Sequence, residues 1–196
     1  MPLWGTSDSD ESKPKNLTTA EKKEVYATNS GWVREAGSIL SGNGNTDADP
    51  EVLVAVSGLA DSIGAADVTE VEWITTTADK SEGFTLSVRV RYNEEVTVTG
   101  SPTIAVTNGN QGSGSGRGPH TLVYASGTGT NELVFSLAIA AANAATNAND
   151  VLSIGAQNIL KPGGAKLKDT ADGTTDAAVA ISGAQGTAAG TLTVTA

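Results

Sequence analysis

The strongest constraint on the fold is the regular alternation of apolar and polar residues between Phe84 and Tyr92. The segment reads Phe-Thr-Leu-Ser-Val-Arg-Val-Arg-Tyr, so every second residue is apolar and those between are Thr, Ser or Arg. This period predicts a strand with one buried face and one solvent-exposed face. Short apolar runs separated by turn residues continue to residue 172. Their spacing predicts an antiparallel β domain of about seven short strands, packed as a sandwich.

Charge is concentrated at the front of the chain. The net charge is −10, and residues 1–82 hold 15 acids and 6 bases, whereas residues 83–196 hold 7 and 6. Because a nucleic acid is bound through a basic face, this balance argues against a nucleic-acid partner. The chain has no cysteine for a disulfide or a thiolate metal site. Neither a secretion signal nor an apolar run of about 18 residues is present, so we expect a soluble protein with no membrane partner.

Residues 1–66 are expected to form a small N-terminal module, and residues 67–196 the β domain. The module begins with a polar, extended arm that contains Leu3 and Trp4. Thr18 followed by Glu21 matches a capping box. The pattern predicts one short helix over 18–27, strands over 31–35 and 52–56 (the second buried on both faces), and a loop over 57–67.

Few residues in the chain suit catalysis. His120 is the only histidine, and the chain has no Gly-x-Ser-x-Gly motif that would supply a nucleophilic serine. A zinc site would need more His or Cys residues than the chain has. We interpret His120 as an exposed histidine at a strand edge. Glu94 and Glu95 follow Tyr92 in an expected turn at 93–95, and we interpret them as solvated charge. The sequence therefore predicts no enzyme, no catalytic residue, no metal site and no cofactor.

Calcium is the alternative to weigh for one acidic segment. Asp169, Asp172 and Asp176 surround a glycine turn, and calcium takes oxygen ligands from loops. The spacing does not match an EF-hand, and Asp side chains also cap backbone amides in tight turns. Both interpretations stay open. The glycine-rich segment 108–119 lacks the Lys-Ser/Thr ending of a phosphate loop, although Arg117 within it could contact a partner.

Three segments of the β domain resemble a known repeat. Residues 92–106 resemble the run F-S-E-x-V-x-V-x-G-x-P-x-L-x-L of the Ig-like repeat in long bacterial surface adhesins. Residues 124–135, Tyr-Ala-Ser-Gly-Thr-Gly-Thr-Asn-Glu-Leu-Val-Phe, resemble its hairpin Y-x-S-G-S-G-T-N-T-L-x-F. Residues 159–169 look like the segment that precedes its I-x-D-x-A-G-N turn. The resemblance covers about residues 68–182 and implies an Ig-like β-sandwich that serves as a spacer or adhesive module.

The N-terminal module is similar to a different family. The opening Met-Pro-Leu-Trp-Gly-Thr-Ser-Asp, together with residues 12–15, 31–35 and 51–56, is similar to the attachment module of virion proteins from tailed phages of marine bacteria. The acidic stretch 42–50 departs from that pattern.

These resemblances lead to a functional hypothesis. We expect a capsid decoration or cement protein on the virion surface, assembled in the host cytoplasm, that binds the major capsid protein or other virion subunits. Aromatic side chains often anchor such contacts, so the expected partner-binding residues are Leu3, Trp4, Tyr26 and Trp32. Homo-oligomerisation is left open. The alternative is a host-surface or glycan-binding adhesin on the tail or neck, with specificity in the glycine loop near His120.

Overall fold

The strand with the clearest alternation is also the longest strand in the structure, which is a computed structural model. The structure describes residues 13–14, 16–109, 119–143 and 145–196. Strand β6 runs over Phe84–Thr99, and its side chains at Leu86, Val88 and Val90 are fully buried, which confirms the predicted buried face. The expected turn at 93–95 is wrong, because β6 continues through it with an irregular register against its neighbour.

The other elements follow the chain in two groups. In the N-terminal module they are α1 (Thr19–Lys23), β1 (Val25–Thr28), β2 (Gly31–Arg34), the 3-10 helix η1 (Ile39–Ser41), β3 (Glu51–Ala55) and α2 (Leu59–Ser62). In the β domain they are β4 (Val68–Trp73), β5 (Ala78–Asp79), β6, β7 (Thr103–Asn108), β8 (His120–Ser126), β9 (Thr130–Ile139), β10 (Val151–Ser153), β11 (Gln157–Asn158), η2 (Pro162–Gly164), β12 (Lys166–Asp169), β13 (Ala180–Ile181), α3 (Gly183–Ala189) and β14 (Thr191–Thr195).

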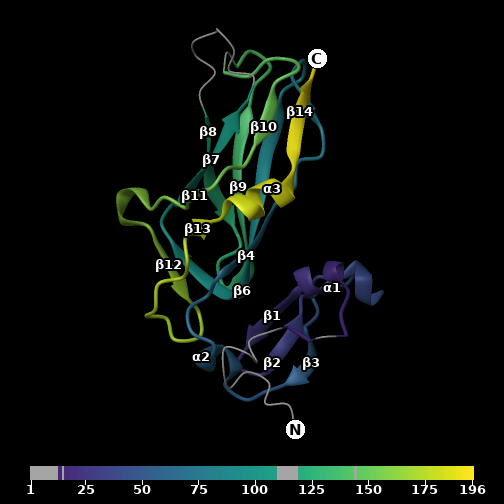
Figure 1. The fold of residues 1–196 in the computed structure, drawn as a ribbon, viewed down its shortest axis with the longest axis vertical. Helices are drawn as coiled ribbons and strands as arrows, with labels where there is room; N and C mark the ends of the chain where they lie inside the picture. Colours follow the sequence, from purple (N-terminus) through teal and green to yellow (C-terminus); the bar gives the residue numbers. More distant parts are fainter. Residues whose placement is uncertain (1–12, 15, 110–118, 144) are drawn as a thin grey trace.

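The protein is mainly β: most of its described strands form one large mixed sheet, and β11 pairs with β13 in a separate two-stranded sheet. The large sheet runs in the order β3-β2-β1-β6-β9-β8-β7-β10-β14-β5, with β4 and β12 also paired to β6. Most pairs are antiparallel, but β1 joins β6 and β14 joins β5 in parallel. The prediction of a purely antiparallel architecture is therefore wrong. Figure 1 shows the N-terminal module at one end of an elongated molecule and the C-terminus at the other.

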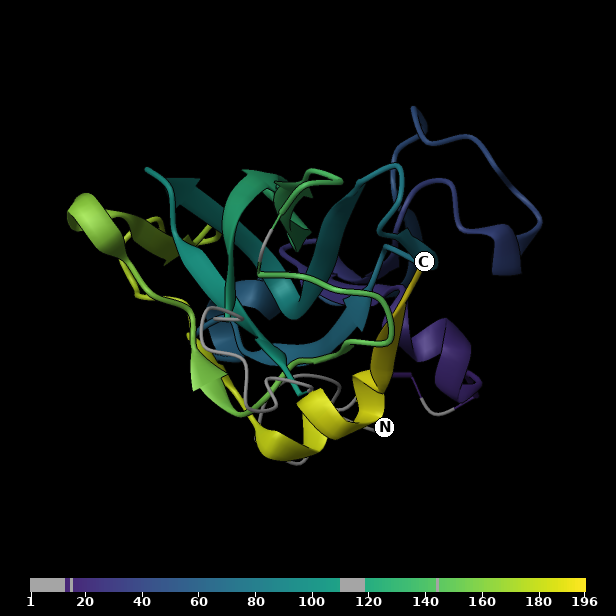
Figure 2. The same cartoon turned by 90° about the horizontal axis from the view of Figure 1, so that it is seen from above.

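Two hydrophobic clusters stabilise the two ends of the molecule. The larger runs from Ala66 to Val194 and is built mostly from Val, Leu and Ile. The smaller centres on Trp32 and includes Leu59 of α2. Helix α3 packs beside β4 and lies along the outside of the strands (Figure 2). The sequence switches from one cluster to the other between Ile63 and Ala66.

The secondary structure predicted for the N-terminal module is confirmed only in part. The capping box is confirmed: Glu21 N donates to Thr18 Oγ1 at 3.2 Å, and Thr18 N donates to Glu21 Oε2 at 2.8 Å. The helix ends at Lys23 rather than at residue 27, because Val25–Thr28 pair with β2 as strand β1. Helix α2 lies within the segment expected to be a loop.

Strand β3 forms where expected, but its predicted burial on both faces is wrong. Among the described strands it pairs with β2 alone, and Val52 is 50% exposed. The apolar run is typical of a buried strand, yet β3 lies at an edge because no other described strand follows it in the sheet order.

Candidate functional site at the junction of the N-terminal module and the β domain

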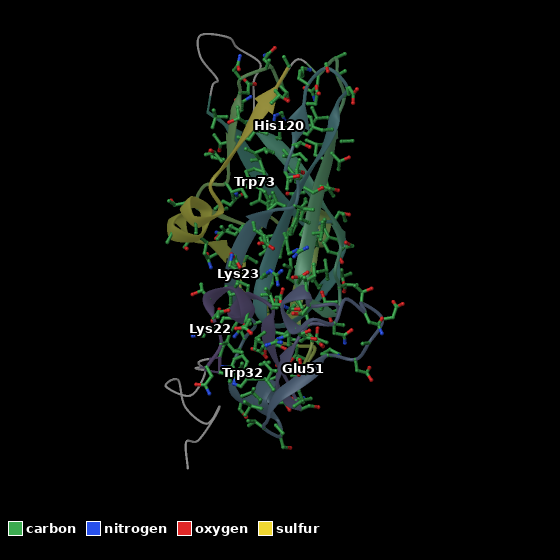
Figure 3. All side chains as sticks on the ribbon, turned by 90° about the vertical axis from the view of Figure 1, so that its right-hand side faces the viewer. Lys22, Lys23, Trp32, Glu51, Trp73 and His120 are labelled. Carbon is green, nitrogen blue, oxygen red and sulfur yellow. The ribbon has the colours of Figure 1, made fainter. Side chains whose placement is uncertain are left out.

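The expected partner-binding residues lie in different places. Leu3 and Trp4 fall outside the described residues. Tyr26 on β1 is 5% exposed, and Trp32 on β2 is 1% exposed and packs in the smaller cluster. Figure 3 shows Trp32 within the N-terminal module, far from His120 toward the opposite end. Trp32 is thus a core residue, and the role of these four residues in binding stays a prediction.

His120 differs from its interpretation as an exposed histidine. It begins β8, it is 4% exposed, and its Nε2 lies 3.1 Å from Thr146 Oγ1, which is also buried. Burial lowers the pKa of His120, and Asp150 opposes that shift. The imidazole therefore lies in a buried polar contact with Thr146 rather than at an exposed strand edge.

The acidic segment after β12 caps a turn. Asp172 Oδ1 accepts hydrogen bonds from the backbone N–H groups of Thr174 and Thr175, both at 2.8 Å. Asp176 forms an ion pair with Lys168 at 2.9 Å. These contacts match the second interpretation, in which the Asp side chains serve the turn itself. Among the described residues, no three His, Asp or Glu side chains gather closely enough to hold a metal ion.

Glu94 is the clearest departure from the sequence interpretation, which treated it as solvated charge. It is 1% exposed, and neither carboxylate oxygen has a hydrogen-bond partner among the residues that the structure describes. The cause lies in the junction between the module and the domain. Glu94 sits in the irregular part of β6, where Ala27 of β1 forms the single parallel bridge to it.

A pocket of about 250 Å³ opens beside Glu94. Both parts of the chain contribute to it. Its lining comes from the end of β1 and the turn after it, from α2, from β6, and from the end of β12: Ala27, Thr28, Asn29, Ala60, Glu94, Glu95, Asp169, Thr170 and Ala171. Burial and the nearby Asp169 carboxylate raise the pKa of Glu94 to about 8.

A wider hollow of about 640 Å³ lies over the arginines of β6. Arg91 is 5% exposed, although the alternation placed it on the solvent face, because the N-terminal module covers it. Its Nη1 lies 3.0 Å from Glu35 Oε2 and 2.6 Å from Glu132 Oε1, and it donates to the backbone oxygen of Lys23 at 2.9 Å. Burial raises the pKa of Glu35 to about 7, with Arg91 opposing the shift.

Sequence reasoning missed both features of this junction. One signal for the ion-pair network was available in the sequence: acidic residues in β4 and basic residues in β6. Glu72 and Arg89 are direct neighbours across these two strands, and opposite charges attract in such a pair. The local signal for Glu94 was the alternation itself, which places Glu94 on the same face as Val90 and Tyr92, but the expected turn at 93–95 hid it. No described helix is long and apolar enough to cross a membrane.

Comparison of the chain with protein-family models, with curated proteins and with solved structures finds no match. The resemblances to the adhesin repeat and to phage virion proteins therefore rest on the motifs quoted above.

Proposed function

We propose that the protein is a structural component of a tailed-phage particle and has no catalytic activity. In this proposal it is a capsid decoration protein. Its N-terminal module attaches to the major capsid protein, and its β domain projects as an Ig-like sandwich. The attachment end should therefore expose apolar surface, and the projecting end should be stable by itself.

The observation that carries the proposal is the exposure of large apolar side chains on the N-terminal module. Ile39 is 85% exposed, and Leu40 and Val52 are each 50% exposed. Contiguous exposed apolar side chains mark protein interfaces, and Ile39 and Leu40 are adjacent in η1.

The position of β3 supports the same surface. An edge strand presents unpaired backbone N–H and C=O groups, which can pair with a strand from another chain. Val52 lies on this edge strand, so backbone pairing and apolar contact are available on one element. The major capsid protein would add a strand or a loop along β3.

The β domain has features suited to projection. Its hydrophobic cluster spans Ala66 to Val194 and is separate from the cluster of the module. In Figure 1 the β domain extends away from the module along the long axis of the molecule.

The experiment is binding of purified protein to phage shells that lack it, measured by cosedimentation. The variant Val52→Lys places a charge on the exposed edge strand, and we expect its affinity for shells to fall at least tenfold. Leu160→Lys is the matched control, because Leu160 is 61% exposed on the β domain. A deletion of residues 1–12, which removes Leu3 and Trp4 but leaves α1 and β1, tests the arm.

The shell proposal fails if Val52→Lys and the deletion both saturate shells as the unmodified protein does. Thermal melting of each variant shows that loss of binding is not loss of folding. Binding of the full chain to a glycan array, without binding to shells, would support the adhesin alternative instead.

A further inference from the structure

Glu94 is a buried carboxylate that lacks a partner within the described chain. It is 1% exposed, and both oxygens are free of hydrogen bonds. Burying an ionised carboxylate without a partner is strongly unfavourable. Such a carboxyl group is either protonated or paired with a cation that does not belong to this chain.

The acidic neighbours of Glu94 strengthen its demand for a cation. Asp169 is 2% exposed, but its Oδ1 already accepts a hydrogen bond from Ala171 N at 2.8 Å. Asp61, Asp67 and Asp172 add further negative charge around Glu94. Glu94 is therefore a buried carboxylate with both oxygens unpaired among the described residues; Glu95 also lines the pocket, and the field around Glu94 is negative.

The walls of the pocket have a different character from its charged end. Ala27 on β1 and Ala60 in α2 are buried, and Ala171 after β12 also lines the space. Small methyl groups leave room for a slender apolar chain. A volume of about 250 Å³ exceeds what a bare metal ion needs.

We propose that this pocket binds a primary alkylammonium group, with the cation on the Glu94 carboxylate and the methylene chain between Ala27, Ala60 and Ala171. Lysine side chains and small amines share this chemistry, in which an apolar stem carries a compact charge. A metal ion fits less well, because the described residues do not bring three ligating side chains together. The proposal stands on the pocket alone and does not require the proposed function.

The test uses the full chain and isothermal titration calorimetry with three probes at constant ionic strength. The probes are N-acetyl-lysine methylamide, 1,4-diaminobutane and magnesium or calcium chloride. We expect an amine to bind with a Kd in the millimolar range, as suits one ion pair with a short apolar contact. Tighter binding of the acetyl-lysine probe would identify a protein lysine as the source, and tighter binding of the diamine a free amine.

Two variants and a control make the assignment specific. Glu94→Gln removes the charge, and we expect the amine affinity to fall at least tenfold. Ala171→Phe fills the pocket from an exposed position and should also abolish binding while the fold is kept. Glu82→Gln is the control, because it makes the same charge change at an exposed site outside the pocket lining.

The pH dependence provides an independent readout. Because the pKa of Glu94 is about 8, its ionised fraction rises from about 10% at pH 7 to about 90% at pH 9, and the amine affinity should rise about tenfold. Glu94→Gln should remove this rise. No amine binding at pH 9, equal binding by Glu94→Gln, or stoichiometric displacement of the amine by magnesium or calcium would each overturn the proposal.

Discussion

At the residue scale, His120 shows how burial selects a protonation state. Its Nε2 lies 3.1 Å from Thr146 Oγ1, and both side chains are buried within the β domain. Burial disfavours the charged imidazolium and lowers the pKa of His120, and the Asp150 carboxylate opposes the shift without reversing it. The folded protein therefore holds a neutral imidazole at pH 7.

This state predicts how stability responds to acid. Since the pKa of His120 is lower in the folded chain than its ordinary 6.5, the unfolded chain binds more protons near pH 6, and stability falls as the pH falls. Relative to His120→Gln, the free energy of unfolding should drop by up to about 1.4 kcal/mol per pH unit below pH 6.5. Urea unfolding at pH 7.5 and 5.0 measures the difference. If the difference in unfolding free energy between the protein and His120→Gln stays constant or changes in favour of the protein at pH 5.0, His120 is not held neutral in the folded state.

At the element scale, the turn between β1 and β2 depends on a single glycine. Gly31 has φ +129°, and a Cβ placed there would lie 2.0 Å from the backbone oxygen of Val54 on β3. Three strands thus approach each other at a point that admits no side chain. Gly31 also opens the strand that carries Trp32, the largest side chain of the smaller cluster.

Gly31→Ala should therefore destabilise the protein by more than about 2 kcal/mol, since it combines backbone strain with a steric clash. Gly44→Ala is the matched control, because a Cβ there meets nothing within 4 Å. Chemical denaturation followed by tryptophan fluorescence compares the two. Equal stability of both variants would show that β3 can move away from Gly31 without cost.

At the scale of the whole molecule, Arg91 couples the N-terminal module to the β domain. One guanidinium on β6 contacts Glu35 and the backbone of Lys23 in the module, and Glu72 and Glu132 in the β domain. A second ion pair, Lys23 with Glu70, joins the same two parts. The continuous sheet adds only one bridge between β1 and β6.

Arg91→Gln should cost about 1.5–3 kcal/mol, because it removes the charged hydrogen bonds of a buried guanidinium and leaves half-buried Glu35 without this cation, while Glu72 and Glu132 keep Arg89. Arg89→Gln should cost clearly less, since the Arg89 side chain is 29% exposed. We expect limited proteolysis of Arg91→Gln to cleave between the two hydrophobic clusters, near residues 63–66. An equal loss of stability in Arg91→Gln and Arg89→Gln would contradict the role of Arg91 in coupling the N-terminal module to the β domain.

Features that depend on residues close together in the sequence could be predicted, and features that depend on distant residues could not. The buried face of Phe84–Tyr92 and the capping box of Thr18 with Glu21 depend on residues within a few positions, so the sequence pattern revealed them. The end of α1 at Lys23 was missed, because pairing with β2 overrode the helical pattern. The exposure of β3 was missed because an apolar run does not show whether another strand will lie beside it.

The sequence by itself determined the buried face of Phe84–Tyr92 and the place of several other strands, how charge divides along the chain, and that few residues suit catalysis. Only the tertiary structure decided which individual polar side chains are buried. Arg91 lies on the face of β6 whose alternation indicates solvent, and Glu94 lies in a segment expected to be an exposed turn, yet both are buried. The physical reason is that the N-terminal module covers Arg91, while β1, α2 and β12 surround Glu94. The local sequence of a strand carries no information about which distant segments will cover its side chains.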